Sequence, residues 1–191
     1  MKRLQNYLVA VIILFVANTA SAITSDTVGV FDPAGFWHLR NSNSSGAADI
    51  PAFDYGGGDW KPVAGDWNGD GKDTIGVFDP TGKWHLRNSN SSGAADIPAF
   101  AYGAGDWTPV VGDWDGDGID TIGVFDPAGF WHLRNSNSSG AADIIAFDYG
   151  GGNWIPVVGD WDGIPEPATA LLGLIGMAGL GMRRRRVASD V

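Results

Sequence analysis

The stretch from Asp66 to Pro80 reads "DWNGDGKDTIGVFDP", an acidic loop followed by an apolar, β-branched segment. It returns from Asp113 to Pro127 as "DWDGDGIDTIGVFDP", and the strings "GDW", "FDP" and "RNSNSSGAADI" recur at the same spacing of 47 residues. A fixed period of this size is typical of repeat proteins. We therefore divide the central part of the chain into three repeats at 27–73, 74–120 and 121–163.

Each repeat contains four short segments with strand character. In the first repeat they are "TVGVF" (27–31), "FWHLRN" (36–41), "ADIPAFDY" (48–55) and "WKPVAGDW" (60–67). These segments are rich in β-branched and aromatic residues and are separated by turn residues. The string "DPAG" (32–35) fits a type I turn. The proline in the third segment predicts a strand at a sheet edge.

No window shows a helical period with capping signals, and every connection is short, so consecutive strands are expected to pair antiparallel. The sequence thus predicts an all-β fold of three four-stranded β-meanders. Such a meander is the unit of a β-propeller blade. The alternative architecture is an open β-solenoid arc, which the long period disfavours.

The N-terminal residues 1–22 have the pattern of a secretory signal peptide. Lys2 and Arg3 precede the apolar run Leu8 to Ala17, and Ala20-Ser21-Ala22 fits a cleavage site. The alternative is an uncleaved anchor. We expect export and a repeat domain that spans residues 23–164.

The C-terminal part contains a Pro-Glu-Pro triplet, an apolar stretch at 168–182 and an arginine cluster, before a tail at 187–191. The apolar stretch is short for a spanning helix, and the arginines should stay on the cytoplasmic side. Residues 165–186 resemble the bacterial PEP-CTERM sorting signal, which implies cell-surface or extracellular release by an exosortase-type protease; an ordinary tail anchor is the alternative. The residues that carry this resemblance are Pro165, Glu166, Pro167, Arg183, Arg184, Arg185 and Arg186.

The composition of residues 23–164 excludes several classes of protein. This region holds 20 Asp, no Glu and six Lys or Arg, a net charge of −14, which argues against nucleic acid as a partner. The chain has no cysteine, so disulfides cannot stabilise it. Nine tryptophans, three in each repeat, supply apolar mass for a core.

The acidic loop begins like a calcium loop of the EF-hand type. Asp66, Asn68 and Asp70 occupy positions 1, 3 and 5, and Gly71 occupies position 6. Position 12 is Val77 instead of Glu, and no helices flank the loop. Hard oxygen ligands with no Cys or His nearby favour Ca²⁺ over zinc or copper. The alternative is a solvated Asp-Gly turn without metal.

An Asp-rich loop between two strands resembles the loops of FG-GAP repeats, called VCBS-type repeats in bacteria. The resemblance implies side-chain ligands and one backbone carbonyl per loop. These are Asp66, Asn68, Asp70 and the carbonyl of Lys72 in one loop, and Asp113, Asp115, Asp117 and the carbonyl of Ile119 in the other. The last Asp of the family pattern falls one residue early, at Asp73 and Asp120. A partial third loop would combine Asp160, Asp162 and Asp26.

Other residues that recur once per repeat are weaker candidates. His38, His85 and His132 could converge as a metal or proton site, or they could be ordinary half-buried strand residues. The Trp-rich strands, with Arg40, Arg87 and Arg134 beside them, could stack on sugar rings, as in propeller lectins. No catalytic signature stands out, so a hydrolase is the least favoured class.

The sequence therefore predicts an exported, non-enzymatic, calcium-binding repeat protein with an adhesion or scaffolding role; a carbohydrate-binding lectin is the alternative. A polysaccharide or a surface protein would be its ligand. In FG-GAP blades the calcium loop joins the first strand to the second, so the first blade here lacks a first strand. Ile155 to Gly163 is then a first strand without a blade. We expect two chains to exchange these strands in a six-bladed homodimer.

Overall fold

The computed structural model describes residues 26–161 of the 191-residue chain. The signal peptide expected at 1–22, the sorting signal expected at 165–186 and the tail at 187–191 lie outside these residues. The described part forms eleven β-strands and no helix. The strands are β1 (Gly29–Phe31), β2 (Phe36–Leu39), β3 (Phe53–Asp54), β4 (Lys61–Gly65), β5 (Thr74–Phe78), β6 (Lys83–Leu86), β7 (Ile97–Ala101), β8 (Thr108–Gly112), β9 (Thr121–Phe125), β10 (Phe130–Leu133) and β11 (Phe147–Asp148).

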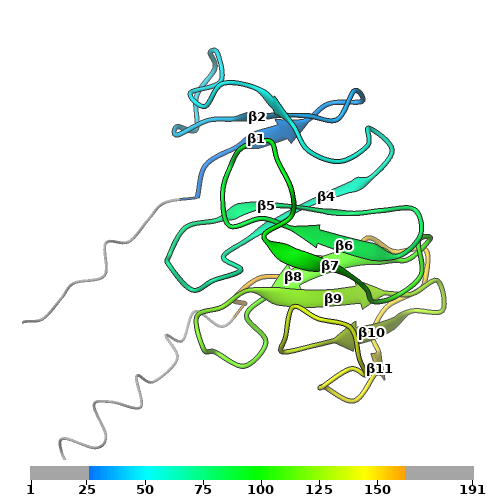
Figure 1. Cartoon of the computed structure of the whole chain (residues 1–191). Coiled ribbons are helices and arrows are strands. Elements are labelled where there is room, and N and C mark those ends of the chain that lie inside the picture. The colour runs from blue at the N-terminus through cyan, green and yellow to red at the C-terminus, as the bar shows by residue number, and fades with distance from the viewer. Residues whose placement is uncertain (1–25, 162–191) are drawn as a thin grey trace, which may run out of the picture.

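The strands form three antiparallel sheets in which each strand pairs with its neighbours in sequence. The first sheet has the order β1-β2-β3, the second β4-β5-β6-β7 and the third β8-β9-β10-β11. Figure 1 shows the sheets one after another along the molecule, with β1 and β2 at one end and β10 and β11 at the other. The all-β prediction is confirmed for the described residues, and each sheet is open rather than closed on itself.

The turn predicted at 32–35 forms as the sequence indicated. The amide of Gly35 donates to the carbonyl of Asp32 at 2.9 Å. The Asp32 carboxylate also accepts from the amides of Ala34 (2.9 Å) and Phe36 (3.0 Å). A carboxylate that caps its own turn explains why Asp begins the turn.

The third strand of every repeat lies at a sheet edge, as predicted from the proline of the first repeat, although the third repeat has Ile145 in place of that proline. In the first repeat this strand is shorter than expected. β3 spans Phe53–Asp54, whereas the sequence predicted 48–55. The preceding loop does not explain this difference, because Arg87 makes the same bonds as Arg40 and β7 still spans Ile97–Ala101. β3 is short because only Phe53 and Asp54 pair with β2, whereas β7 is also paired to β6 at Ile97.

Each neighbouring pair of sheets shares one apolar core. Between the first and second sheets, the core consists of Trp37, Phe53, Tyr55, Ile75 and Val77. Between the second and third sheets, the core consists of Trp67, Phe78, Trp84, Leu86, Tyr102, Ile122 and Val124. Because the repeats supply the same residue types at the same positions, each sheet offers one face to the sheet before it and the other to the sheet after it.

The first strands of the second and third sheets, β4 and β8, lie next to each other. The C-terminal end of β4 is joined to the start of β9, where the amide of Asp120 donates to the carbonyl of Asp66 at 2.9 Å. This pairing brings the two acidic loops to the same edge of the molecule, beside one another.

One expected strand is missing from the described residues. Residues 155–161 match β4 and β8 in sequence, yet they form no strand. A strand needs a partner to accept its backbone hydrogen bonds, and no neighbouring strand within residues 26–161 pairs with this segment.

Candidate metal centre

The two acidic loops connect the first and second strands of the second and third sheets. Asp66–Asp73 joins β4 to β5, and Asp113–Asp120 joins β8 to β9. Both loops have glycine at the sixth position, Gly71 and Gly118, with φ angles of 81° and 85°. A Cβ at either position would meet nothing within 4 Å. Glycine therefore supplies backbone freedom there, not space.

We predict that Gly118→Ala lowers the free energy of unfolding by about 1–2 kcal/mol, the cost of a left-handed conformation for a residue with a Cβ. Gly118→Asn should lose less, because Asn adopts this conformation more readily. Urea unfolding in the presence of chelator measures both variants without a metal contribution. Equal stability of wild type and Gly118→Ala would contradict this role of the glycine.

The first aspartate of each loop closes the turn with both carboxylate oxygens. Oδ1 of Asp113 accepts from the amides of Gly116 (2.9 Å) and Asp117 (3.1 Å), and Oδ2 accepts from the amide of Gly118 (2.8 Å). The matching bonds in the other loop run to Asp66 from the amides of Gly69, Asp70 and Gly71, at 2.8, 3.1 and 2.6 Å. Because the same bonds form twice, the loop conformation is encoded in this short sequence.

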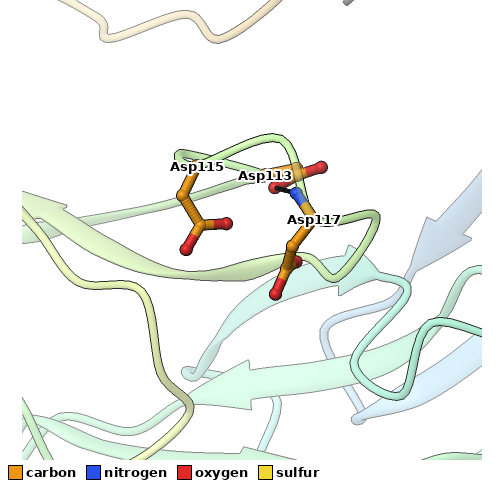
Figure 2. Close-up of side chains that lie close together, drawn as sticks. All are labelled: Asp113, Asp115 and Asp117. Carbon is orange, nitrogen blue, oxygen red and sulfur yellow. Dashed lines mark hydrogen bonds between the residues drawn. The ribbon is translucent and has the colours of Figure 1, made fainter. Parts of the chain in front are cut away.

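Three carboxylates gather in the second loop. Asp113, Asp115 and Asp117 are exposed and each offers an oxygen within 4.8 Å of the others. Figure 2 shows the carboxylates of Asp115 and Asp117 on the same side of the loop, while the amide of Asp117 is bonded to Asp113. Like charges this close repel one another, and a cation between them would remove the repulsion. Oxygen ligands of this kind suit Ca²⁺.

At its third position the first loop has an amide, Asn68, where the second loop has the carboxylate of Asp115. Nδ2 of Asn68 donates to Oδ2 of Asp70 at 3.0 Å, and the amide of Asp70 donates to Oδ1 of Asn68 at 3.3 Å. The Asn68 side chain thus partners Asp70 within the loop. With one charge fewer, this loop would attract a divalent cation less strongly than the second loop.

The last aspartate of the second loop lies between the two loops. Oδ2 of Asp120 accepts from the amide of Asp66 at 2.8 Å, a contact that sequence reasoning about one loop at a time missed. Burial raises the pKa of Asp120, and the charges of Asp113 and Asp66 raise it further against the effect of a backbone hydrogen bond. Burial likewise raises the pKa of Asp73, followed by the charges of Asp120, Asp26 and Asp66. Asp66, Asp113 and Asp120 thus bring carboxylates together where the loops meet.

The remaining predicted ligands are placed as follows. The amides of Lys72 and Ile119 donate to the carboxylates of Asp70 (3.0 Å) and Asp117 (2.9 Å). Of the partial third loop, Asp160 is exposed and Asp162 lies outside the described residues. The carbonyl of Asp26 accepts from Nδ2 of Asn43 at 2.9 Å, a bond repeated at Asp73 and Asp120.

The three histidines each pair with a carboxylate of their own sheet. Nε2 of His38, His85 and His132 lies 3.0 Å from the Asp six residues earlier. The structure gives no support to a shared histidine site, and the ordinary reading as half-buried strand residues holds. The Asp partner was not predicted; the constant spacing in all three repeats was the available signal.

Most tryptophans in the described part contribute to packing. Trp84 is fully buried and its Nε1 donates to the carbonyl of Tyr102 at 3.0 Å. Trp60 and Trp107 stack on histidine rings at centroid distances of 4.8 and 4.9 Å. A row of tryptophans free to stack on sugar is therefore not formed within residues 26–161.

Comparisons of the chain with protein-family models, with curated proteins and with solved structures gave no significant match. In the part of the chain that the structure describes, no helix has the length and apolar character needed to cross a membrane. The loops themselves thus carry the functional argument.

Proposed function

We propose that this chain is an exported, non-enzymatic, calcium-binding repeat protein of the cell surface or extracellular matrix, with a scaffolding or adhesion role. In this proposal the three sheets are blades of the β-propeller type. The bacterial sorting signal at 165–186 directs the protein to an exosortase-type protease, and its ligand is a polysaccharide or another surface protein.

The observation that carries the proposal is the carboxylate group of Asp113, Asp115 and Asp117, in a loop that occurs twice in nearly the same form. In both copies the first Asp and a left-handed Gly fold the loop, and in the second copy the three carboxylates are exposed and close together. The two loops also lie next to each other, so their carboxylates together favour binding of a divalent cation. Its charge would offset the carboxylates that crowd between β4 and β8.

The test is a calorimetric titration of the protein with Ca²⁺. We predict two sites in the wild type, and one site in either Asp70→Ala or Asp117→Ala, because each change removes a central carboxylate from one loop. Asn68→Asp should tighten the first loop, since it restores the charge that the second loop has. Two sites in both alanine variants would show that the ligand assignment is wrong.

A separate prediction concerns sorting. Replacement of Arg183, Arg184, Arg185 and Arg186 by Gln should reduce C-terminal processing and release, because the positive charges that hold the tail on the cytoplasmic side are lost. Immunoblots of cell and medium fractions measure processed and unprocessed chain, and a four-Lys variant is the control. Normal processing of the Gln variant would contradict the sorting assignment and would leave the calcium proposal untouched.

A further inference from the structure

The first sheet has an open edge where each of the other two sheets has a strand. The segment from Thr27 to Phe31 differs from β5 and β9 only by Val in place of Ile. β5 and β9 are buried along their whole length, whereas Val28 and Val30 are 53% and 64% exposed. The difference has two causes: β5 and β9 have a strand alongside, β4 or β8, and their side chains also pack on the preceding sheet. Nothing within residues 26–161 covers β1 in this way.

A cleft of about 640 Å³ lies along that edge, between β1 and β4. Pro62 and Ala64 on β4 line it and are exposed. The equivalent residues of β8, Pro109 and Val111, are half-buried because β4 lies against them. The cleft is therefore the position that β4 and β8 occupy in the other two sheets.

The opposite end of the molecule holds a segment that matches these strands. Residues 155–161 read "IPVVGDW", against "TPVVGDW" at 108–114. Val158 approaches Gly112 of β8, with Cγ1 3.1 Å from where a Cβ would lie, as Val111 approaches Gly65 of β4 at 2.9 Å. The segment thus lies beside β8 in the same way as β8 lies beside β4. β4 and β8 each begin a sheet, but residues 155–161 pair with no sheet within the described residues.

We propose that residues 155–161 of one copy of this chain insert along β1 of a second copy and complete its first sheet. The pairings of β4 with β5 and of β8 with β9 share one register. The same register, applied to the inserted segment, gives an antiparallel pairing. It places Ile155 opposite Phe31, Val158 opposite Val28 and Gly159 opposite Thr27. The insertion rests on the geometry of the sheets and does not depend on calcium or export.

Two tryptophan contacts support this register. Trp60 and Trp107, just before β4 and β8, stack on the histidine two strands away in the same sheet. Trp154 occupies the same place before the inserted segment and is 67% exposed. Within the described residues, His38 has no such contact with a tryptophan ring. Insertion would place Trp154 against His38, as Trp60 lies against His85. Likewise Trp161, 77% exposed, would reach the carbonyl of Val28, as Trp67 reaches that of Ile75 at 3.3 Å.

The outer faces of the first and third sheets are also complementary. In the first sheet Phe53 and Tyr55 are 8% exposed, because they pack on the β5 side chains of the next sheet. Their equivalents in the third sheet, Phe147 and Tyr149, are 41% and 76% exposed. Val28 and Val30 of a second copy would cover them. This contact would be equivalent to the one that Ile75 and Val77 make with Phe53 and Tyr55.

Two other occupants of the cleft are less well matched. Residues 14–18, one period before β4, read "LFVAN" and lack the Gly-Asp-Trp that follows both filled positions. The same chain's own 155–161 lies beside β8, two sheets away from β1 in Figure 1. A second copy supplies the right sequence from a position that keeps its contact with β8. Mutual insertion by two chains would make six sheets, within the range of closed propellers.

The test is disulfide trapping, because the chain has no cysteine of its own. Two full-length chains with different tags, one with Val28→Cys and the other with Val158→Cys, are co-expressed and oxidised with copper-phenanthroline. Directly opposite residues on neighbouring strands are within disulfide range. Ala64→Cys with Ile75→Cys in one chain is the positive control, because these residues are paired in the structure. Val157→Cys in place of Val158→Cys is the register control, since its side chain points to the other face.

We expect a mixed-tag product of twice the chain mass from Val28→Cys with Val158→Cys, at least 10-fold more abundant than from the register control. Larger products in a ladder would still support insertion and would mean that the head-to-tail contact does not close at two chains. Two results would overturn the proposal. One is closure of the positive control with no mixed-tag product. The other is the result for a single chain that carries both Val28→Cys and Val158→Cys. If its disulfide forms only within the chain, the cleft belongs to the chain's own C-terminal segment.

Discussion

Removal of calcium is expected to lower the melting temperature of the protein by roughly 10–20 °C. A ligand that binds only the folded state at 100 times its dissociation constant stabilises by about 2.7 kcal/mol per site. Two loops therefore contribute about 5 kcal/mol, which for a domain of this size corresponds to a shift of that order. Calcium modules of extracellular proteins bind at about 10⁻⁴–10⁻³ M, so the melt is recorded in 10 to 100 mM Ca²⁺ and again in excess chelator.

The controls separate a loop effect from a general salt effect. The double variant Asp70→Ala with Asp117→Ala should melt at the same temperature with and without Ca²⁺, because both loops lose a central carboxylate. Mg²⁺ at equal concentration should stabilise the wild type less, since it requires stricter octahedral geometry. A wild-type melt that chelator leaves unchanged would remove the metal from the account of this protein.

The sequence was informative about the strands because the same pattern of β-branched and turn residues occurs in all three repeats. The turn at 32–35 and the edge position of the third strand follow from single residues whose backbone preferences are strong, and both were found. The start of the third strand was misplaced in the first repeat, where β3 pairs with β2 only at Phe53 and Asp54, although the equivalent β7 pairs with β6 from Ile97 onwards. The extent of such pairing is not visible in a local pattern of β-branched residues.

The same limit applies to the candidate site. The gathering of Asp113, Asp115 and Asp117 follows from alternate spacing in one short loop, and local geometry is enough to predict it. The position of Asp120 between two loops depends on how β4 packs beside β8, a contact between residues far apart in sequence. Burial of β5 but not of β1 is a further case, because the two nearly identical sequences differ in their surroundings: β5 has β4 alongside and the first sheet packed on its side chains.

Asp79→Ala is expected to lower the free energy of unfolding by about 2–4 kcal/mol, since a buried carboxylate that accepts several hydrogen bonds leaves its donors unpaired when it is removed. Asp79 accepts from the amide and hydroxyl of Thr81, at 2.8 and 2.6 Å, and from the amide of Lys83, at 3.1 Å. Its other oxygen lies 3.0 Å from Nε2 of His85. Urea unfolding at neutral pH with chelator present measures the loss.

The pH dependence of that loss has a defined direction. Burial alone would raise the pKa of Asp79, but the hydrogen bonds from Thr81, His85 and Lys83 outweigh it and lower the pKa from 3.8 to about 2. A carboxyl group with a lower pKa in the folded state stabilises the fold above its unfolded pKa and loses this contribution as pH falls towards the folded value. The stability gap between wild type and Asp79→Ala should therefore be constant above about pH 5 and shrink between about pH 4 and pH 2.

Asp32 is the matched control, because it begins the same turn in the first sheet and lies 3.0 Å from its own histidine. Its side chain is 35% exposed against 10% for Asp79, so water can replace the lost bonds. Asp32→Ala should therefore destabilise clearly less than Asp79→Ala, also because Ala34 replaces Thr81, whose hydroxyl bonds to Asp79. Equal losses would mean that neither the Thr81 hydroxyl nor the covering of the second sheet by its neighbours sets the strength of these contacts.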